Sequence, residues 1–202
     1  MRKLLIATHN QGKAREYREL LSGLPLDVTY LDAEGIAHEV DETGATMAEN
    51  ARLKATAYAQ LSGLWTWADD SGLEVDALGG APGVYSARYA GEGKTDADRY
   101  RKLLDALTGV PWDRRAARFR CVVALTTPGG ELRLTEGVCE GVIAFGPAGS
   151  NGLGYDPVLY MPAHGATMAQ LPQELKNQVS HRARASQQAL ALLAEMVAGA
   201  EG

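Results

Sequence analysis

The segment that most constrains the fold is A-D-D-S-G-L at residues 68–73, directly after the apolar residues 64–67. Two adjacent carboxylates, Asp69 and Asp70, are costly at the end of a buried strand because like charges oppose each other's ionisation. A cation or a proton-transfer role compensates for that cost. Successive side chains of a strand point to opposite faces, so only one of the pair can face a given cleft. Taken alone, the segment also fits an ordinary turn, with Ser71 and Gly72 reversing the chain.

Length and composition narrow the class of protein. With 202 residues, 46% of them hydrophobic, the chain predicts one globular domain over residues 1–202, or two lobes that share a core. A formal charge of −5 argues against a nucleic-acid partner, since phosphate-backbone affinity comes from clustered Lys and Arg. No apolar run approaches the ~20 residues of a membrane span, and nothing resembles a secretory leader. Cys121 and Cys139 form no disulfide framework, so we expect reduced core cysteines in a cytoplasmic protein.

Hydrophobic periodicity predicts alternating strands and helices. The strand patterns cover residues 2–7, 26–31, 64–68, 118–127, 131–144 and 158–161, and the helical patterns cover 12–21, 46–61, 95–107 and 180–197. Thr46 and Glu49 have the spacing of a capping box, and Gly63 is placed to end that helix. Residues 118–144 read as a hairpin, which brings antiparallel pairing into the sheet. The fold class expected is therefore α/β with a mixed sheet.

The first candidate site is T-H-N-Q-G-K at residues 8–13, between the first strand and the first helix. A helix N-terminus at this place supplies backbone amides and a positive dipole for phosphate. Thr8 and Asn10 can add hydrogen bonds, and Lys13 adds a point charge. The segment lacks the pattern of a Walker loop. An ordinary strand-to-helix turn with a solvated Lys13 fits this motif equally well.

The second candidate is the acidic loop at residues 39–44. Carboxylates from this loop, gathered with Asp69 or Asp70, would form an oxygen-rich site suited to Mg²⁺ or Mn²⁺. For an isolated acidic run, an exposed loop is the more common outcome. On the helix that follows, Lys54 faces either phosphates or solvent.

Two further segments lie near the C-terminus. The glycines of G-L-G-Y-D-P at residues 152–157 let the backbone approach a flat ligand, Tyr155 offers a ring edge and a hydroxyl, and Asp156 accepts hydrogen bonds. Ser180 suits a helix N-cap, which places His181 and Arg182 in the first turn. Cations there oppose the helix dipole, so an anionic or carbonyl-bearing ligand is the economical explanation. The other two histidines, at positions 38 and 164, read as surface residues.

Taken in order, these segments resemble the Ham1-like inosine triphosphate pyrophosphatase family over essentially the whole chain. The motifs that carry the resemblance are T-x-N-x-x-K at residues 8–13, E-T-G at 42–44, E-N-A-x-x-K-A at 49–55, A-D-D-S-G-L at 68–73, L-G-G-A-P-G-x-Y-S-A-R-Y at 78–89, G-Y-D-P at 154–157 and S-H-R at 180–182. Each motif is weakly specific by itself, whereas the ordered set is specific.

The resemblance implies a homodimeric enzyme that depends on Mg²⁺, with Mn²⁺ as the alternative metal. Its fold would be two-lobed α/β around a long mixed sheet, with the active site in the cleft between the lobes. Its reaction would be hydrolysis of ITP, dITP and XTP to the monophosphate and pyrophosphate, which keeps deaminated purines out of nucleic acid. A purine nucleoside triphosphate is therefore the expected partner.

The resemblance also implies roles for individual residues. Asp70 is the general base for water and, with Glu42, organises the metal. The substrate-binding residues carried over by position are Thr8, His9, Asn10, Gln11, Gly12, Lys13, Ser71, Leu153, Gly154, Tyr155, Asp156, Lys176, His181 and Arg182. The family commonly has an aromatic residue where this chain has Leu153. Leucine lacks the stacking contribution of ~1–3 kcal/mol per base, so either base affinity is weaker or Tyr155 compensates.

The chemistry agrees with the residues considered without the resemblance. No Cys, Ser-His-Asp or Lys nucleophile is evident, so direct attack of water on phosphorus is the economical mechanism. Donors at His181 and Arg182 would favour a purine with a 6-carbonyl over adenine. Two alternatives remain open. A phosphomonoesterase with an aspartyl nucleophile would need D-x-D rather than adjacent aspartates, and a nucleotide sensor would need no catalytic set.

Overall fold

The structure is a computed structural model that describes residues 2–200. Three terminal residues of the predicted 1–202 domain, Met1, Glu201 and Gly202, lie outside the described residues. The chain divides into two compact units. Unit 1 contains the segment that ends at Asp70, Cys121–Gly137 and the segment that begins at Ala183, and unit 2 contains Ser71–Arg120 and Val138–Arg182.

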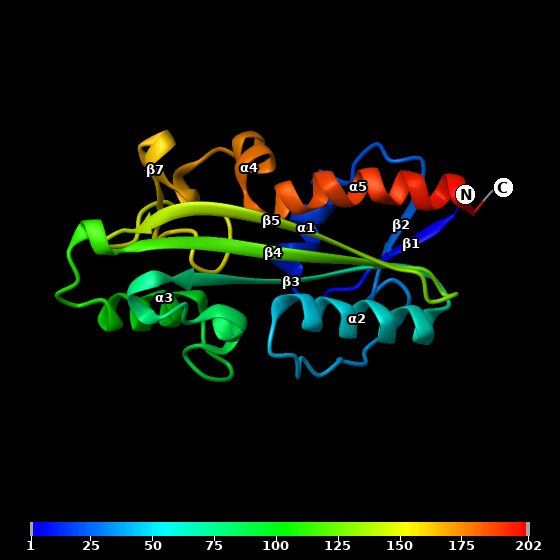
Figure 1. Cartoon of the computed structure of the whole chain (residues 1–202), viewed down its shortest axis with the longest axis horizontal. Coiled ribbons are helices and arrows are strands. Elements are labelled where there is room, and N and C mark those ends of the chain that lie inside the picture. The colour runs from blue at the N-terminus through cyan, green and yellow to red at the C-terminus, as the bar shows by residue number, and fades with distance from the viewer. Residues whose placement is uncertain (1, 201–202) are drawn as a thin grey trace. The chain divides into compact units, whose positions relative to one another are not determined.

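Seven strands are hydrogen-bonded in the order β2-β1-β3-β4-β5-β6-β7. Their bounds are β1 Lys3–Ile6, β2 Asp27–Tyr30, β3 Trp65–Val75, β4 Ala116–Thr126, β5 Leu132–Ile143, β6 Leu159–Met161 and β7 Ala166–Thr167. β1 pairs in parallel with β2 and β3, whereas β6 pairs antiparallel with β5 and β7. Helices flank the strands, which confirms the predicted α/β fold with a mixed sheet (Figure 1).

The α-helices are α1 Gln11–Leu20, α2 Met47–Ser62, α3 Asp96–Ala106, α4 Gln173–Val179 and α5 His181–Gly199. The capping box predicted for α2 is present: Thr46 accepts from the Glu49 amide, and Glu49 accepts from the Thr46 amide. Gly63 ends α2 in the left-handed region with φ 69°, which costs glycine no Cβ strain. The seven-residue α4 was not predicted, because so short a helix shows little periodicity.

The core of unit 1 lies on one face of β1, β3 and β4. Side chains of α1 and α5 cover this face, while α2 lies on the opposite side of the strands (Figure 1). Tyr17 of α1 packs edge-on against Trp67 of β3, with ring centroids 5.7 Å apart. Both rings are fully buried. This layer fixes the face of β3 from which Asp69 extends.

Unit 2 has a separate core. It joins α3 with β3, β4, β5 and β6 through buried residues that include Leu73, Leu103, Phe119, Ile143 and Leu159. Both cysteines are buried and outside any disulfide, Cys121 in unit 1 and Cys139 in unit 2. Among the described residues, no helix combines the length and apolar character needed to cross a membrane.

One strand boundary was predicted wrongly. The strand pattern stops at residue 68 and places the acidic pair at a strand end, but β3 continues through Asp69 and Asp70 to Val75. The chain therefore does not turn at Ser71 and Gly72. β3 lies between β1 and β4 in the sheet, and residues 72, 73 and 75 are buried. Burial and pairing on both sides outweigh the turn preference of Ser-Gly.

Candidate active site

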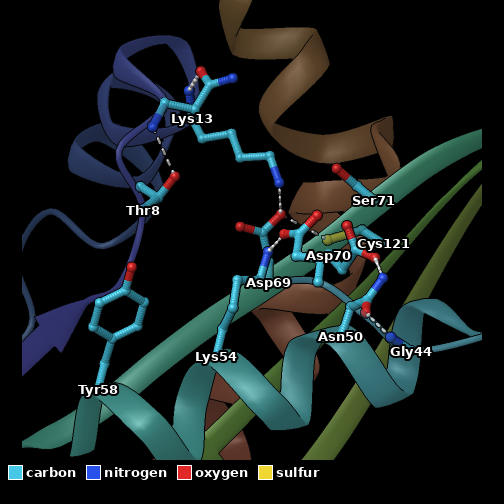
Figure 2. Close-up of polar contacts among 12 residues, drawn as sticks. Thr8, Lys13, Gly44, Asn50, Lys54, Tyr58, Asp69, Asp70, Ser71 and Cys121 are labelled. Atoms are coloured by element: carbon cyan, nitrogen blue, oxygen red, sulfur yellow. Dashed lines mark hydrogen bonds and ion pairs between the residues drawn. The ribbon is translucent and has the colours of Figure 1, made fainter. Parts of the chain in front are cut away.

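In unit 1, the two adjacent aspartates of β3 contact different elements (Figure 2). Asp69 Oδ2 lies 2.9 Å from Nζ of Lys13, which belongs to α1, and 3.8 Å from Sγ of Cys121. Asp70 Oδ2 instead accepts a hydrogen bond of 3.1 Å from Nδ2 of Asn50, which belongs to α2. Because α1 and α2 cover opposite faces, this division agrees with the alternation predicted for the pair.

The β1–α1 turn is built by its own polar side chains. Thr8 Oγ1 accepts from the Asn10 amide, and Asn10 Oδ1 accepts from the Lys13 amide as the N-cap of α1. Lys13 is not the solvated residue that one interpretation allowed, because its side chain is 14% exposed and pairs with Asp69. The turn therefore presents a cation and a helix N-terminus together.

The side chains of the other polar residues predicted in this turn, His9 and Gln11, contact residues of unit 1. His9 Nε2 lies 3.1 Å from the carbonyl oxygen of His38, and Gln11 Nε2 donates to Asp32 Oδ2 at 3.0 Å. Gly12 lies in the first turn of α1. The side chains of His38 and His164 are exposed, as predicted.

The acidic loop folds back onto α2. Glu42 is half-buried and forms an ion pair with Lys54, whereas Glu39 and Asp41 of the same loop are exposed, as an isolated acidic run favours. The side chain of Lys54 is 13% exposed, which also rules out a solvated helix face. Unit 1 thus contains the carboxylates of Glu42 and Asp70. The same unit contains the ammonium groups of Lys13 and Lys54.

Burial and charge set the ionisation of this group. Burial raises the pKa of Asp70 above the usual carboxyl value, and Lys54, Lys13 and the Asn50 hydrogen bond only partly oppose that rise. Burial works against the charge of Lys54, but Asp69, Glu42 and Asp70 outweigh it and raise the pKa of the ammonium. Asp70 is therefore a more basic carboxylate than an exposed one, beside a lysine that stays charged.

In unit 2, the loop at residues 152–156 is held by buried polar contacts. Lys176 Nζ lies 2.7 Å from Asp156 Oδ2, which also accepts from the Leu153 amide at 3.1 Å. A Cβ on Gly152 would meet Asp156 Oδ2 at 1.9 Å, so only glycine fits there. The Gly154 amide donates to Asp96 Oδ2 at 2.7 Å. The loop backbone is thereby fixed from several sides.

The side chain of Tyr155 does not take the role suggested by the sequence. Its ring is buried in the core of unit 2, and its hydroxyl donates to the Ser86 carbonyl at 2.8 Å. Burial raises the pKa of this hydroxyl well above its usual value. In this structure the ring of Tyr155 is therefore not free to stack on a base. Leu153, which is half-buried, is the residue left at the stacking position.

His181 and Arg182 form the first turn of α5, as predicted, and both are buried. The imidazole of His181 stacks on Phe119, with ring centroids 4.6 Å apart and planes inclined by 18°. Arg182 Nη2 donates to Ser71 Oγ at 3.2 Å. The structure thus brings together two predicted residues, Ser71 and Arg182, that lie 111 positions apart in the sequence.

Comparison with known proteins agrees with these motifs. The Ham1 family model matches residues 4–192. The chain belongs to the Ham1 family. This Ham1 chain is 51% identical over 185 residues to a dITP/XTP pyrophosphatase of Geobacillus kaustophilus, covering 92% of the chain and 91% of that protein. It is 50% identical to a dITP/XTP pyrophosphatase of Desulforamulus reducens, covering 95% of each.

Solved structures give the same family. A HAM1 protein from Coxiella burnetii superposes with a TM-score of 0.87 and 42% identity, covering 96% of this Ham1 chain and all of that one. The Staphylococcus aureus Ham1 protein gives a TM-score of 0.86 at the same identity and coverage. The fold predicted from the family resemblance is confirmed.

Sequence reasoning missed three residues that hold the predicted ones: Asn50, Asp96 and Phe119. Asn50 reads as part of a helix face, Asp96 as an acidic residue at a helix start, and Phe119 as one more core position of a strand. Asn50 does carry a signal, since asparagine is unfavourable inside a helix unless a partner holds it. Asp96 carries none, because an acidic residue at a helix start stabilises the helix by itself.

Proposed function

We propose that this chain hydrolyses the deaminated purine nucleoside triphosphates ITP, dITP and XTP to the monophosphate and pyrophosphate. Family membership and relatives of about 50% identity named dITP/XTP pyrophosphatases support this reaction. The single structural observation that carries it is a group of three carboxylates and two lysines in unit 1. Lys13 pairs with Asp69, and Lys54 pairs with Glu42. Both lysines act on Asp70, whose pKa is raised by burial. Such a set suits an anionic, metal-bound phosphate chain.

The donor chemistry fits Mg²⁺, with Mn²⁺ as the alternative. Mg²⁺ binds through one or two carboxylates together with substrate phosphates and water. Glu42 and Asp70 would supply those two carboxylates. Within residues 2–200, no group of three or more His, Cys, Asp or Glu side chains gathers as a self-sufficient metal site. Glu42 and Asp70 alone would therefore bind the cation weakly, and the substrate triphosphate would supply further ligands.

In the proposed mechanism, Asp70 accepts the proton of the attacking water, which adds to the α-phosphorus so that pyrophosphate leaves in one step. A bound divalent cation would neutralise charge on the phosphate oxygens. The ammonium of Lys13, held by Asp69, binds the phosphates and stabilises charge that grows on the leaving pyrophosphate. Lys54 orients Glu42 through their ion pair. Thr8 and Asn10 keep the helix N-terminus of α1 in place for phosphate.

Base recognition is assigned to unit 2. We place the purine against Leu153, Gly154 and Asp156 of the fixed loop, with Tyr155 contributing only through its backbone. His181 and Arg182 donate to the 6-carbonyl of hypoxanthine or xanthine, where adenine carries an amino group and leaves those donors unpaired. Lys176 acts by holding Asp156 rather than by reaching the nucleotide.

The proposal includes a homodimer in the cytoplasm that acts on the free nucleotide pool. Size-exclusion chromatography with light scattering tests the oligomeric state. Two buried cysteines outside any disulfide suit a reducing compartment, which supports the location.

The decisive experiment incubates the purified protein with ITP, XTP, dITP, GTP or ATP and Mg²⁺, and separates pyrophosphate from orthophosphate. We expect pyrophosphate from ITP, XTP and dITP, and little product from ATP. Orthophosphate as the first product would replace the proposal with a phosphomonoesterase. Tight binding without turnover would replace it with a nucleotide sensor.

A further inference from the structure

Asn50 of α2 connects the two segments that carry the proposed metal ligands. Its Oδ1 accepts from the Gly44 amide at 2.8 Å, and its Nδ2 donates to Asp70 Oδ2 at 3.1 Å. Gly44 lies two residues after Glu42. One side-chain amide thereby links the acidic loop to the carboxylate of β3 (Figure 2).

This amide is a buried and directional link. Asn50 is 0% exposed, so a lost partner would leave a buried polar group unsatisfied. Its two ends are not interchangeable: rotating the amide by half a turn would set its NH₂ against the Gly44 N–H and its oxygen against Asp70. The bond to Nδ2 therefore fixes how the carboxyl group of Asp70 is turned.

Gly44 is shaped for this contact. A Cβ on Gly44 would meet Glu49 Cβ at 2.6 Å and Asn50 Oδ1 at 2.7 Å. The loop backbone can approach Asn50 only without a side chain at this position. One helical turn further along α2, Lys54 holds the side chain of Glu42 from the same loop. α2 thus holds the loop by its backbone through Asn50 and by its carboxylate through Lys54.

We propose that Asn50 is a positioning residue. It holds Asp70 and the Glu42 loop in the arrangement that binds a divalent cation together with the substrate triphosphate. The inference rests on the proposed pyrophosphatase function. Asn50 does not touch the reacting atoms; it acts by orienting groups that do, and such outer partners typically change metal affinity or activity by about 10–100-fold.

The test compares Asn50→Ala with wild type and with the control Thr46→Ala. Thr46→Ala removes the N-cap of the same helix and lowers stability without touching Asp70 or Gly44. The readouts are kcat, KM for ITP, the Mg²⁺ concentration for half-maximal rate, thermal stability, and binding of Mn²⁺ alone followed by electron paramagnetic resonance. For Asn50→Ala we expect kcat to fall and half-saturating Mg²⁺ to rise, each by about tenfold or more, with weaker Mn²⁺ binding.

Gly44→Ala approaches the same contact from the loop and decides the question if Asn50→Ala does not fold. Gly44→Ala should also raise the Mg²⁺ concentration for half-maximal rate. The double variant should raise that concentration by less than the product of the two single effects. Asn50→Ala with unchanged Mg²⁺ and Mn²⁺ dependence and only lower thermal stability, like Thr46→Ala, would overturn the inference. Wild type that makes no pyrophosphate would overturn the proposed function instead, and Mn²⁺ binding would still decide the role of Asn50.

Discussion

Lys13 and Asp69 form an ion pair in which Nζ lies 2.9 Å from Oδ2, and Asp69 is 2% exposed. The Cys121 thiol lies 3.8 Å from the same carboxylate oxygen. An ammonium held in this way loses little side-chain freedom when it binds phosphate, because Asp69 already restricts it. The first of the adjacent aspartates therefore holds the lysine, and in the proposed mechanism the second binds the metal and accepts the proton of the water.

Lys13→Ala should raise KM for ITP and lower kcat, with a combined loss of about 10²-fold in kcat/KM, because charge grows on the leaving pyrophosphate in the transition state. The variant also removes the ion pair of the buried Asp69 carboxylate and should melt at a lower temperature. Lys3→Ala is the matched control, since Lys3 pairs with Glu34 at an exposed site. Intact kinetics with only a lower melting temperature would reduce Lys13 to a structural residue.

Asp70→Asn should lower turnover far more than it weakens nucleotide binding, because the amide keeps the shape but loses both charge and basicity. Single-turnover kinetics and nucleotide titration measure the two effects separately. Asp69→Asn should be milder, since Asp69 acts through Lys13. Activity above about a tenth of wild type in Asp70→Asn, a barrier change under ~1.4 kcal/mol, is incompatible with Asp70 as the base.

The raised pKa of Asp70 also predicts how stability depends on pH without metal. Because its folded-state pKa lies above the unfolded value, the folded protein holds this proton more tightly. Stability from this group is therefore present at low pH and is lost as pH rises through the folded pKa. Asn at position 70 cannot titrate, so the melting temperature of Asp70→Asn relative to wild type should increase with pH. Thermal melts with chelator from about pH 4 to pH 8 measure it; a constant difference would contradict the shift.

Arg182→Ala should lower the ITP-over-ATP ratio of kcat/KM by about tenfold or more, because it removes a donor to the 6-carbonyl. Arg182 also donates to Ser71, so Ser71→Ala removes that bond and the expected substrate contact of Ser71 but keeps the Arg182 donor, which isolates the contribution of Arg182 itself. Steady-state kinetics on both nucleotides give the ratio. If the ratio stays at the wild-type value, the base is read by His181 or by backbone groups of the 152–155 loop.

Leu153→Phe should tighten binding of ITP and ATP together, by up to the ~1–3 kcal/mol that stacking contributes per base, and leave the preference between them unchanged. Every purine presents a π-face, so stacking alone does not discriminate. Calorimetric titration with each nucleotide in the presence of Ca²⁺ measures the two affinities. A change in preference would mean that residue 153 contacts the base edge rather than its face.

Local sequence determined the elements whose signals lie within a few residues. Thr46 and Glu49 form their capping box across three positions, and Gly63 ends the same helix by its own conformational freedom. Thr95 and Asp98 do the same for α3. The β1–α1 turn and the start of α5 were likewise predicted where the structure has them. Ordered motifs then indicated the family, which the comparisons confirmed.

Tertiary structure decided what depends on contacts between distant residues. β3 runs through the acidic pair because its neighbours in the sheet and the burial of both faces outweigh the local turn preference of Ser71 and Gly72. The Tyr155 hydroxyl bonds to Ser86, 69 positions away, and so does not point to a ligand as its loop sequence suggests. Asn50 meets Asp70 across 20 positions through a side-chain amide, a pairing that no hydrophobic period records. Hydrophobic periodicity indicates which face of a helix or strand is buried. The hydrogen-bond partners of polar side chains on that face depend on which elements pack against it, and those are set by the tertiary structure.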